Sequence, residues 1–572
     1  MKTRAESLGG FHAFVLQFAL AVVFCTTFAN VPARADCTTA AVAALGVPGM
    51  TIASANDVPA AAPNPEYCDV KGSLMTSGDG AEPGSTNFEV MLPVNWNGKF
   101  VFHGVGGLAG TLNSSANPGD RPLFLARGYA TAITDTGHLA SDPAWEYTAP
   151  GSPDMPKIVD YFYRAVHQMT LAAKLLVKNY YHAGAIERSY FDGCSNGGKM
   201  GLIEASRFPS DYDGIISGSP WIDPVGTSLW SLKNATALLD AYIPAAKFAE
   251  VGAAILKQCD KADGVADGLI QNPAKCAFQP DALVPEILTQ KQADALKRIM
   301  DPVRDEQGRL IYPGASVGNL GQVNVTQRGV ANYLDAPPAD PASAKPWGDG
   351  TVPDNWSLTQ NILMKLGYYD GTKNMNNTIE TSGVVKSDAL NLVYTRLAAD
   401  LPGAPSQYGE FFAKGGKLLM YHGYDDLIIS PYRSIWFYED LAQSNGGYDK
   451  LQAHARLFMV PGMQHCLTGA GPTSFETLNA IEQWVEKGVA PETIPATHST
   501  NNVVDRTMPL CKFPEQARYK GSGDPNSVSS WSCPQDDKSL LAVGPNGVQA
   551  GVNAAVPARV SDLSKLASKN RN

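Results

Sequence analysis

The feature that most constrains this chain is a Gly-x-Ser-x-Gly segment, Gly193–Gly197, between a β-prone run, Ser189–Phe191, and a helix-compatible run, Met200–Phe208. Strand, sharp turn and helix in this order form a nucleophile elbow. Glycine permits so tight a turn, and the residue at its apex stands exposed above the sheet. The segment therefore predicts Ser195 as a catalytic nucleophile.

A second copy of the same pattern shows how little the pattern means without its context. Gly314–Gly318 also reads Gly-x-Ser-x-Gly, but Asn319, Gly321 and a β-prone run follow it, with no helix to complete an elbow. We interpret this copy as a surface loop.

The order of the other elements predicts the fold class. Strand candidates occupy 87–92, 99–103, 128–135, 189–191, 212–217, 417–422 and 456–460, and helical periodicity occupies 158–181, 200–208, 432–443 and 474–487. Alternating strands and helices form βαβ units and a mostly parallel sheet. Between about 221 and 404 this order gives way to Pro- and Gly-rich pieces with short helical runs.

At 572 residues the chain exceeds one ordinary core. We therefore expect an α/β-hydrolase fold with a large inserted cap. The core is expected at 36–220 and 405–572, and the cap at 221–404.

The N-terminal segment predicts export. Lys2 and Arg4 precede an apolar run that is too short to span a bilayer, and Ala33-Arg-Ala35 offers a cleavage signal before Asp36, so residues 1–35 read as a signal peptide. No later segment is long and apolar enough to cross a membrane. The mature protein is expected to be soluble and either secreted or periplasmic. Its formal charge of −10, without a basic cluster, argues against nucleic acid or an anionic membrane as partner.

Removal of the signal peptide, with Cys25, leaves eight cysteines. An even number in an oxidising compartment predicts four disulfides, although eight cysteines allow 105 pairings. Their spacing suggests three local loops and one long-range bridge: Cys37–Cys68, Cys259–Cys276, Cys511–Cys533 and, from the remaining pair, Cys194–Cys466.

The two cysteines of the long-range bridge each lie next to a candidate catalytic residue. A serine nucleophile needs a base and an orienting acid, which follow late strands in the order Ser, Asp or Glu, His. Asp425 and Asp426 follow the strand at 417–422, and His465 follows the strand at 456–460. Cys194 directly precedes Ser195 and Cys466 directly follows His465, so their bridge would bring the nucleophile and base together. The base is His465, while either aspartate fits the acid.

With these residues in place, the chain resembles the tannase and feruloyl esterase family from about Cys37 to Cys533. The resemblance rests on motifs with a Cys-Ser nucleophile, an Asp in a His-Gly-x-x-Asp turn and a His-Cys pair, together with two flanking segments: Gly193–Gly198, His422–Asp426, Pro461–Cys466, Phe208–Gly214 and Ala517–Asp524.

The resemblance implies roles for particular residues. It implies that Asp426 is the triad acid, that Gly107 is the first oxyanion-hole donor and that His422 is a substrate-side histidine. Asn196, directly after the nucleophile, would give the second oxyanion N–H. No organic cofactor is implied, and the oligomeric state is left open.

A loop at Cys259–Ile270 carries three carboxylates spaced by three and four residues, with glycines that permit a tight wrap. Such oxygens suit calcium, although an acidic solvated turn is the commoner meaning of such a loop. The resemblance implies a structural Ca²⁺ site with these ligands: the carboxylates of Asp260, Asp263 and Asp267 and the carbonyls of Val265 and Leu269.

The combined reading is a serine carboxylic-ester hydrolase acting on small aromatic esters of the feruloyl or galloyl type. The terephthalate-ester members carry an Arg-x-x-Gly-Phe-Ser segment in the cap, whereas 336–359 here contains neither Arg nor Phe, which disfavours that substrate. Trp347, Trp356, Tyr368 and Tyr369 are candidate aromatic walls. A serine peptidase on the same fold and an inactive phenolic-ligand-binding protein are the alternatives.

Overall fold

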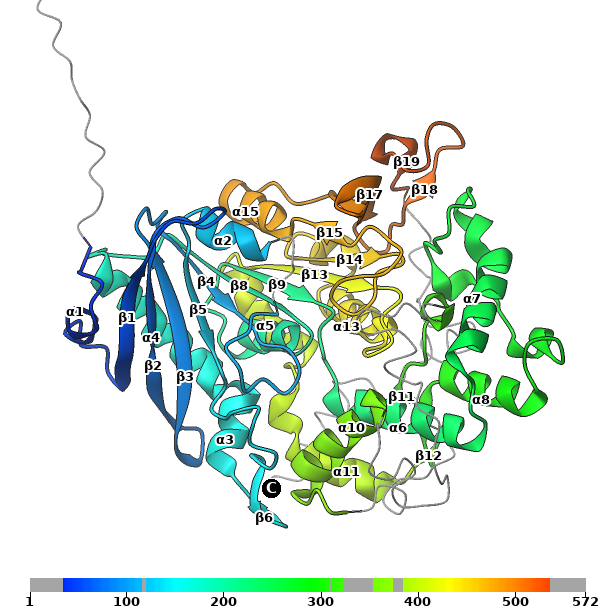
Figure 1. Ribbon diagram of the computed structural model, residues 1–572, viewed down its shortest axis with the longest axis horizontal. Helices are drawn as coiled ribbons and strands as arrows, with labels where there is room; N and C mark the ends of the chain where they lie inside the picture. The colour runs from blue at the N-terminus through cyan, green and yellow to red at the C-terminus, as the bar shows by residue number, and fades with distance from the viewer. Residues whose placement is uncertain (1–33, 116–119, 309, 322–352, 374–383, 535–572) are drawn as a thin grey trace, which may run out of the picture.

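The computed structural model describes residues 34–115, 120–308, 310–321, 353–373 and 384–534 (Figure 1). Most of the predicted signal peptide lies outside these ranges. Among the described helices, none has the length and apolar character needed to span a bilayer.

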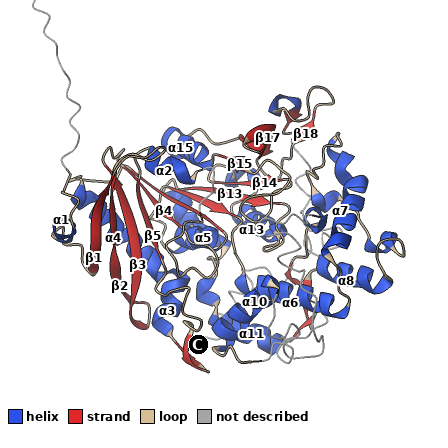
Figure 2. Ribbon diagram, in the orientation of Figure 1, coloured by secondary structure: helices blue, strands red, loops and turns tan. Residues whose placement is uncertain are grey.

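The centre of the fold is a nine-stranded sheet (Figure 2). Its strands, in spatial order, are β1 (Met50–Val58), β2 (Tyr67–Gly78), β3 (Ala81–Pro93), β5 (Ala130–Thr134), β4 (Lys99–His103), β8 (Arg188–Cys194), β9 (Gly214–Gly218), β13 (Lys417–Gly423) and β14 (Ala455–Val460). From β5 to β14 all neighbours are parallel, while β1, β2, β3 and β5 pair antiparallel. The mostly parallel sheet expected from the sequence is confirmed, with an antiparallel extension at one edge.

Side chains alternate between the two faces of the parallel strands, as a period of two requires. Phe100, Phe102 and Phe191 join the core on one face, while Val101 and Tyr190 join the core on the other. The first core packs against helices α4 (Ala165–Tyr180), α5 (Asn196–Arg207) and α13 (Pro431–Ser444), and the second against α2 (Arg121–Ala126) and α15 (Thr477–Lys487). With both faces covered, these strands can be continuously apolar.

A long insertion separates β9 from β13, which are nevertheless direct neighbours in the sheet. It is mainly helical and contains α6 (Pro224–Asp240), α7 (Ala245–Cys259), α8 (Gln290–Met300), α10 (Asp354–Thr359), a π-helical turn at Gln360–Gly367, α11 (Ser387–Arg396) and a small sheet of β10 (Val303–Asp305), β11 (Leu310–Tyr312) and β12 (Val384–Val385). In Figure 1 these elements form a mostly green body to the right of and below the central sheet. This insertion corresponds to the cap expected at 221–404.

Two features differ from the expectations. The loop at Gly314–Gly318 is not on the surface: Ser316 and Val317 are fully buried, and Ser430 Oγ donates to the Gly314 carbonyl at 2.8 Å. The interpretation as a surface loop was wrong because the loop packs between the cap and the core, which a local pattern does not report. The sequence reading also missed the C-terminal sheet of β15 (Ser474–Phe475), β16 (Thr493–Thr500) and β17 (Val503–Cys511).

Candidate active site

The turn between β8 and α5 has the geometry of a nucleophile elbow. Ser195 lies between the last residue of the strand and the first of the helix, with φ 63° and ψ −125°. A non-glycine residue keeps such a conformation only where its surroundings enforce it, which is typical of functional sites. A Cβ at Gly197 would lie 2.3 Å from Ser115 Oγ, and one at Gly193 would lie 2.6 Å from the Gly197 carbonyl carbon. Both glycines are therefore required by close backbone packing.

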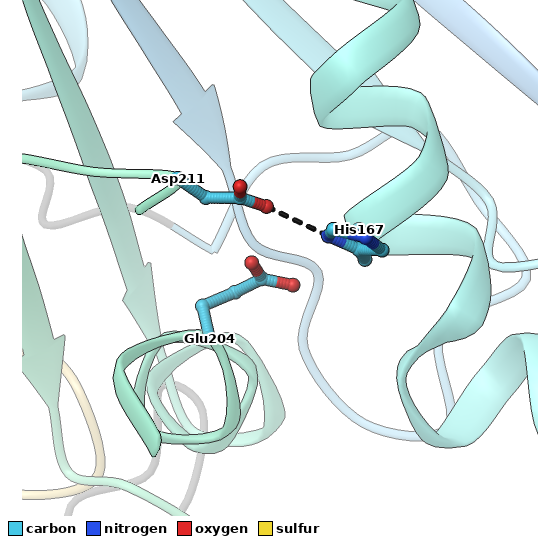
Figure 3. Close-up of side chains that lie close together, drawn as sticks. All are labelled: His167, Glu204 and Asp211. Carbon is cyan, nitrogen blue, oxygen red and sulfur yellow. Dashed lines mark hydrogen bonds and ion pairs between the residues drawn. The ribbon is translucent and has the colours of Figure 1, made fainter. Parts of the chain in front are cut away.

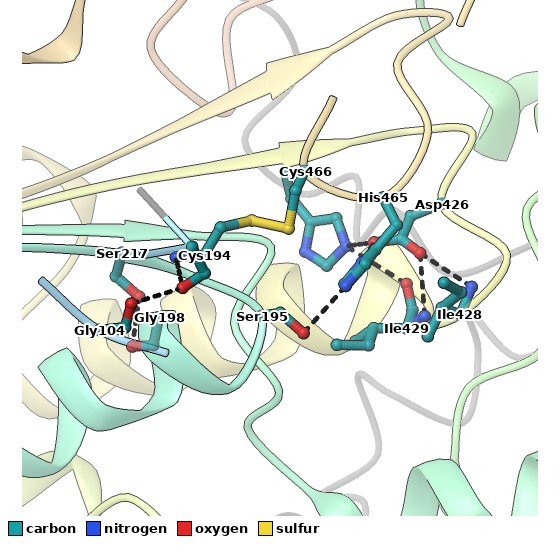
Figure 4. The surroundings of a disulfide bond; sticks show 12 residues. Gly104, Cys194, Ser195, Gly198, Ser217, Asp426, Ile428, Ile429, His465 and Cys466 are labelled. Atoms are coloured by element: carbon teal, nitrogen blue, oxygen red, sulfur yellow. Dashed lines mark hydrogen bonds and ion pairs between the residues drawn. A yellow bond between two sulfur atoms is a disulfide. The ribbon is translucent and has the colours of Figure 1, made fainter. Parts of the chain in front are cut away.

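Three side chains form a continuous hydrogen-bonded chain at this turn (Figure 4). His465 Nε2 lies 2.9 Å from Ser195 Oγ, and His465 Nδ1 lies 2.6 Å from Asp426 Oδ2. The structure thus brings together the three residues predicted as the triad. The arrangement lets the imidazole take a proton from the serine while the carboxylate holds its tautomer.

Asp426 is fully buried and held from both of its oxygens. Its Oδ1 accepts the backbone N–H groups of Ile428 and Ile429, each at 2.9 Å. Burial alone would raise the pKa of Asp426, but the charge of His465 and the hydrogen bonds from His422 and His465 hold that pKa well below its usual range. The carboxylate therefore stays ionised beside the imidazole. Asp425, the other candidate, instead lies against Gly318 of the cap, where a Cβ would meet its Oδ1 at 2.3 Å.

His422 does not lie on the substrate side. Its side chain is fully buried, and it does not line the cavity beside Ser195. Its Nε2 is 3.0 Å from Asp426 Oδ2, and its Nδ1 is 2.8 Å from Ser434 Oγ. The predicted substrate contact was wrong because His422 points back along β13 into the core, where it positions the acid.

The Cys194–Cys466 bridge joins the elbow to the loop that carries His465, with 6.0 Å between the Cα atoms (Figure 4). The other three disulfides are also those expected from spacing: Cys37–Cys68, Cys259–Cys276 and Cys511–Cys533.

The loop after β4 and the start of α5 provide one candidate oxyanion donor each. Gly107 has φ 59° and lines a cavity together with Ser195 and His465. Asn196 is the first residue of α5, where a helix leaves backbone N–H groups without intrahelical partners. His138 supports this loop, because its Nε2 donates to the Leu108 carbonyl at 2.8 Å.

The cavity beside Ser195 has a volume of about 530 Å³. Core residues His138, Trp145 and Glu146 line it, and Trp221 lies where the cap begins. The cap adds Ser357, Leu358, Asn361 and Lys365. The His138 and Trp145 rings stack with centroids 3.9 Å apart.

The sequence did not predict the residues that line this cavity. Of the aromatic residues it offered, Trp356 is buried, Tyr368 and Tyr369 do not line the cavity, and Trp347 lies outside the described residues. The only signal was the aromatic content of 144–147, and that segment lies in a loop without periodicity.

The predicted calcium loop follows α7 and is closed by Cys259–Cys276. Within the described chain, Asp263 Oδ2 is buried without a hydrogen-bond partner, and Asp267 Oδ2 has only Arg506 Nη1, at 3.7 Å. Asp260 curls over the loop and accepts the N–H groups of Asp267 and Gly268 at 3.1–3.2 Å. Buried carboxylate oxygens of this kind suit a hard cation, so the residue types fit the predicted Ca²⁺ site. The three aspartates do not each bring an oxygen within 4.8 Å of the other two, so Ca²⁺ would draw the loop together on binding.

The strand–elbow–helix layout, the cap and the serine–histidine–aspartate geometry define an α/β-hydrolase. The family model "Tannase and feruloyl esterase" matches residues 68–534. The chain is 32% identical to mono(2-hydroxyethyl) terephthalate hydrolase from Piscinibacter sakaiensis, over 83% of this chain and 85% of that one. It is 30% identical to a probable feruloyl esterase from Arthroderma benhamiae, over 78% and 81%.

Solved structures agree with this assignment. Feruloyl esterase B from Aspergillus oryzae superposes with a TM-score of 0.73 at 25% identity, covering 86% of this chain and 98% of that one. Tannin acyl hydrolase from Aspergillus niger has the same fold, with a TM-score of 0.69 at 21% identity, covering 88% and 96%. The chain belongs to the tannase and feruloyl esterase family and is a carboxylic ester hydrolase.

Proposed function

We propose that this protein is an exported serine esterase that hydrolyses esters of hydroxylated aromatic acids, of the feruloyl or galloyl type. The observation that carries the proposal is the Ser195–His465–Asp426 hydrogen-bonded chain at the floor of a cavity walled by Trp145 and Trp221.

In the proposed mechanism Ser195 Oγ attacks the ester carbonyl while His465 Nε2 takes its proton. Asp426 stabilises the imidazolium through Nδ1–H, and the N–H groups of Gly107 and Asn196 receive the oxyanion. His465 then protonates the leaving alcohol, which leaves an acyl-Ser195 intermediate. Water, activated by His465 in the same way, attacks this intermediate and releases the acid.

The charges of the cavity support a neutral, hydroxylated acyl group. Glu146 is 1% exposed, and its Oε2 has no hydrogen-bond partner among the described residues, so it can bond to a ring hydroxyl. Burial raises the pKa of Glu146. Lys365 is the lining cation, but its Nζ donates to the Pro143 carbonyl at 2.7 Å, and Asp142 lines the same region. A free carboxylate on the substrate would therefore meet two acidic side chains against a single ammonium group.

A substrate panel tests this function. Methyl ferulate and methyl gallate are expected to give a higher kcat/KM than methyl cinnamate and methyl benzoate, which lack ring hydroxyls, and than mono(2-hydroxyethyl) terephthalate. The matched amides should be cleaved far more slowly. Amide cleavage at a comparable rate would indicate a peptidase, and binding without turnover would indicate an inactive scaffold.

The Glu146→Leu variant sharpens the same panel. Because a site that bonds a substrate hydroxyl discriminates strongly against analogues that lack it, the variant should lose most of the preference for hydroxylated acids. Its kcat/KM on methyl cinnamate should change little. An unchanged preference would show that Glu146 does not bind the ring hydroxyl. It would leave the proposed roles of the triad residues unaffected.

We also propose that the loop after α7 holds one structural Ca²⁺, with the carboxylates of Asp260, Asp263 and Asp267 and the carbonyls of Val265 and Leu269 as ligands. The buried Oδ2 atoms of Asp263 and Asp267, which accept no hydrogen bond within the described chain, support this proposal. The ion would neutralise these charges and tie the start of the loop to its end.

Removal of calcium with EGTA is therefore expected to lower Tm by about 2–3 °C, because a ligand at 100 times its Kd stabilises by about 2.7 kcal/mol and each kcal/mol corresponds to about 1 °C in a chain of this size. Differential scanning calorimetry measures the shift. Added Ca²⁺, but not added Mg²⁺, should restore it, and Asp267→Asn should abolish the response. A Tm indifferent to both EGTA and calcium would contradict the site.

A further inference from the structure

A second group of metal-ligating side chains lies away from the catalytic cavity. His167 is on α4, Glu204 is near the end of α5, and Asp211 is in the turn that leads into β9. One ligand atom from each side chain lies within 4.8 Å of those of the other two, and among the described residues this is the one such triplet. Figure 3 shows the carboxyl groups of Glu204 and Asp211 and the imidazole directed toward a common space.

Glu204 is the member of the triplet whose buried carboxyl group receives no hydrogen bond from a protein donor. Its side chain is 1% exposed, and neither carboxylate oxygen accepts a hydrogen bond from a donor group among the described residues; the one partner is the Asp211 carboxyl, which can bond to it only through a shared proton. It faces the carboxylate of Asp211, and burial together with that charge raises the pKa of Glu204 well above its usual value. Two carboxyl groups so placed are held together either by a shared proton or by a cation.

The imidazole is already oriented for coordination. His167 Nδ1 lies 2.7 Å from Asp211 Oδ2, and its ring stacks on Phe208 with the centroids 3.7 Å apart and the planes 7° apart. The side chain of His167 is 24% exposed, which leaves an entry path from solvent. The neighbouring cation, Lys174, donates to the backbone carbonyl of Asp211 and not to either carboxylate.

We propose that His167, Glu204 and Asp211 bind a divalent transition metal of the Zn²⁺ type. One imidazole nitrogen and two carboxylate oxygens suit such an ion, whereas Ca²⁺ and Mg²⁺ take oxygen ligands alone. The metal would replace the proton shared by the carboxyl groups and would leave a coordination position toward solvent at His167. It would fasten α4 to the end of α5, the helix that begins at the nucleophile, so its role is structural.

Isothermal titration with ZnCl₂ tests the proposal on chelator-treated full-length protein to which Ca²⁺ has been returned in excess, so that the loop after α7 does not contribute. One equivalent of Zn²⁺ is expected to bind and to raise Tm. His167→Gln and Glu204→Gln should each weaken binding by about 100-fold, since losing even an outer-shell partner of a metal costs about 10–100-fold. Co²⁺ should give a visible absorption band that both variants lose.

His498→Gln is the matched control. His498 Nδ1 pairs with Asp505 Oδ1 at 2.6 Å, so it forms a similar His–Asp contact but is not part of the triplet. It should leave Zn²⁺ binding unchanged. His167 is partly exposed, so His167→Gln is expected to fold even if Glu204→Gln does not. Absence of binding in the parent protein, or undiminished binding in folded His167→Gln, would overturn the proposal in favour of the shared proton.

Discussion

Replacement of Ser195 with alanine is expected to lower kcat on a chromogenic aryl ester by at least about 10⁴-fold, since removing the nucleophile of a triad leaves only oxyanion and binding effects. The change deletes one oxygen atom and retains the backbone conformation of the elbow, so circular dichroism and Tm should match the parent protein. Steady-state and burst-phase kinetics together give the measurement, and the acyl-enzyme burst should vanish.

The chain offers its own control for this variant. Ser316 occupies the same position in the second Gly-x-Ser-x-Gly segment, is fully buried and lies outside the catalytic cavity. Ser316→Ala should cost about 1 kcal/mol of stability through a lost hydrogen bond and leave kcat within a few-fold. If Ser195→Ala keeps activity within tenfold of the parent, the proposed acyl-enzyme mechanism is excluded.

The Cys194→Ala, Cys466→Ala double variant is expected to lose most of its kcat, with a smaller change in KM, at a temperature where it remains folded. Without the bridge, Ser195 and His465 are positioned by loop packing alone, and a displacement of about 1 Å can cost about 100-fold in rate. In the chain-entropy view the bridge also stabilises the fold by about 5 kcal/mol as an upper value. Kinetics run alongside circular dichroism separate the two effects.

A bridge distant from the site distinguishes positioning from general stability. The Cys37→Ala, Cys68→Ala variant removes a disulfide of sequence separation 31 that joins the N-terminal segment to β2. It should lower the free energy of unfolding by about 3–4 kcal/mol in the same view, lower Tm accordingly, and leave kcat unchanged. Parental kcat in the folded Cys194/Cys466 variant would mean that this bridge acts only as a staple.

The parts of the site that the sequence predicted are those fixed by local structure. Ser195 follows from a strand–turn–helix order that spans about twenty residues, and Cys194–Cys466 follows because the other six cysteines pair within short loops. The bridge then supports the choice of His465, which the order of triad residues along the chain had already indicated. The parallel sheet is predictable for the same reason, because the strands and helix of each βαβ unit can be recognised from their own hydrophobic periodicity.

The parts that the sequence missed depend on contacts between distant segments. Trp145 and Glu146 reach the cavity from a loop, and Lys365 reaches it from the cap, so no common period connects them. The prediction for His422 was wrong for a different reason. His422 lies four residues from Asp426, but at the end of β13 its side chain points into the core. The Gly314 loop is buried because it packs against α7 within the cap and against Asp425 and Ser430 of the core, and no local pattern encodes these contacts.

The nesting of the disulfides places a demand on how this chain matures. Three bridges join cysteines that follow one another along the chain, whereas Cys194–Cys466 encloses Cys259–Cys276 within its 272-residue span. Oxidation in the order of synthesis would offer Cys259 to Cys194 long before Cys466 emerges, because N-terminal regions fold first. The native pairing therefore requires one of two conditions. Either the newly folded elbow shields the Cys194 thiol from Cys259, or a non-native disulfide is later rearranged by thiol–disulfide exchange. The bridge at the catalytic centre therefore cannot form until synthesis has passed Cys466, after both cysteines of Cys259–Cys276 have emerged.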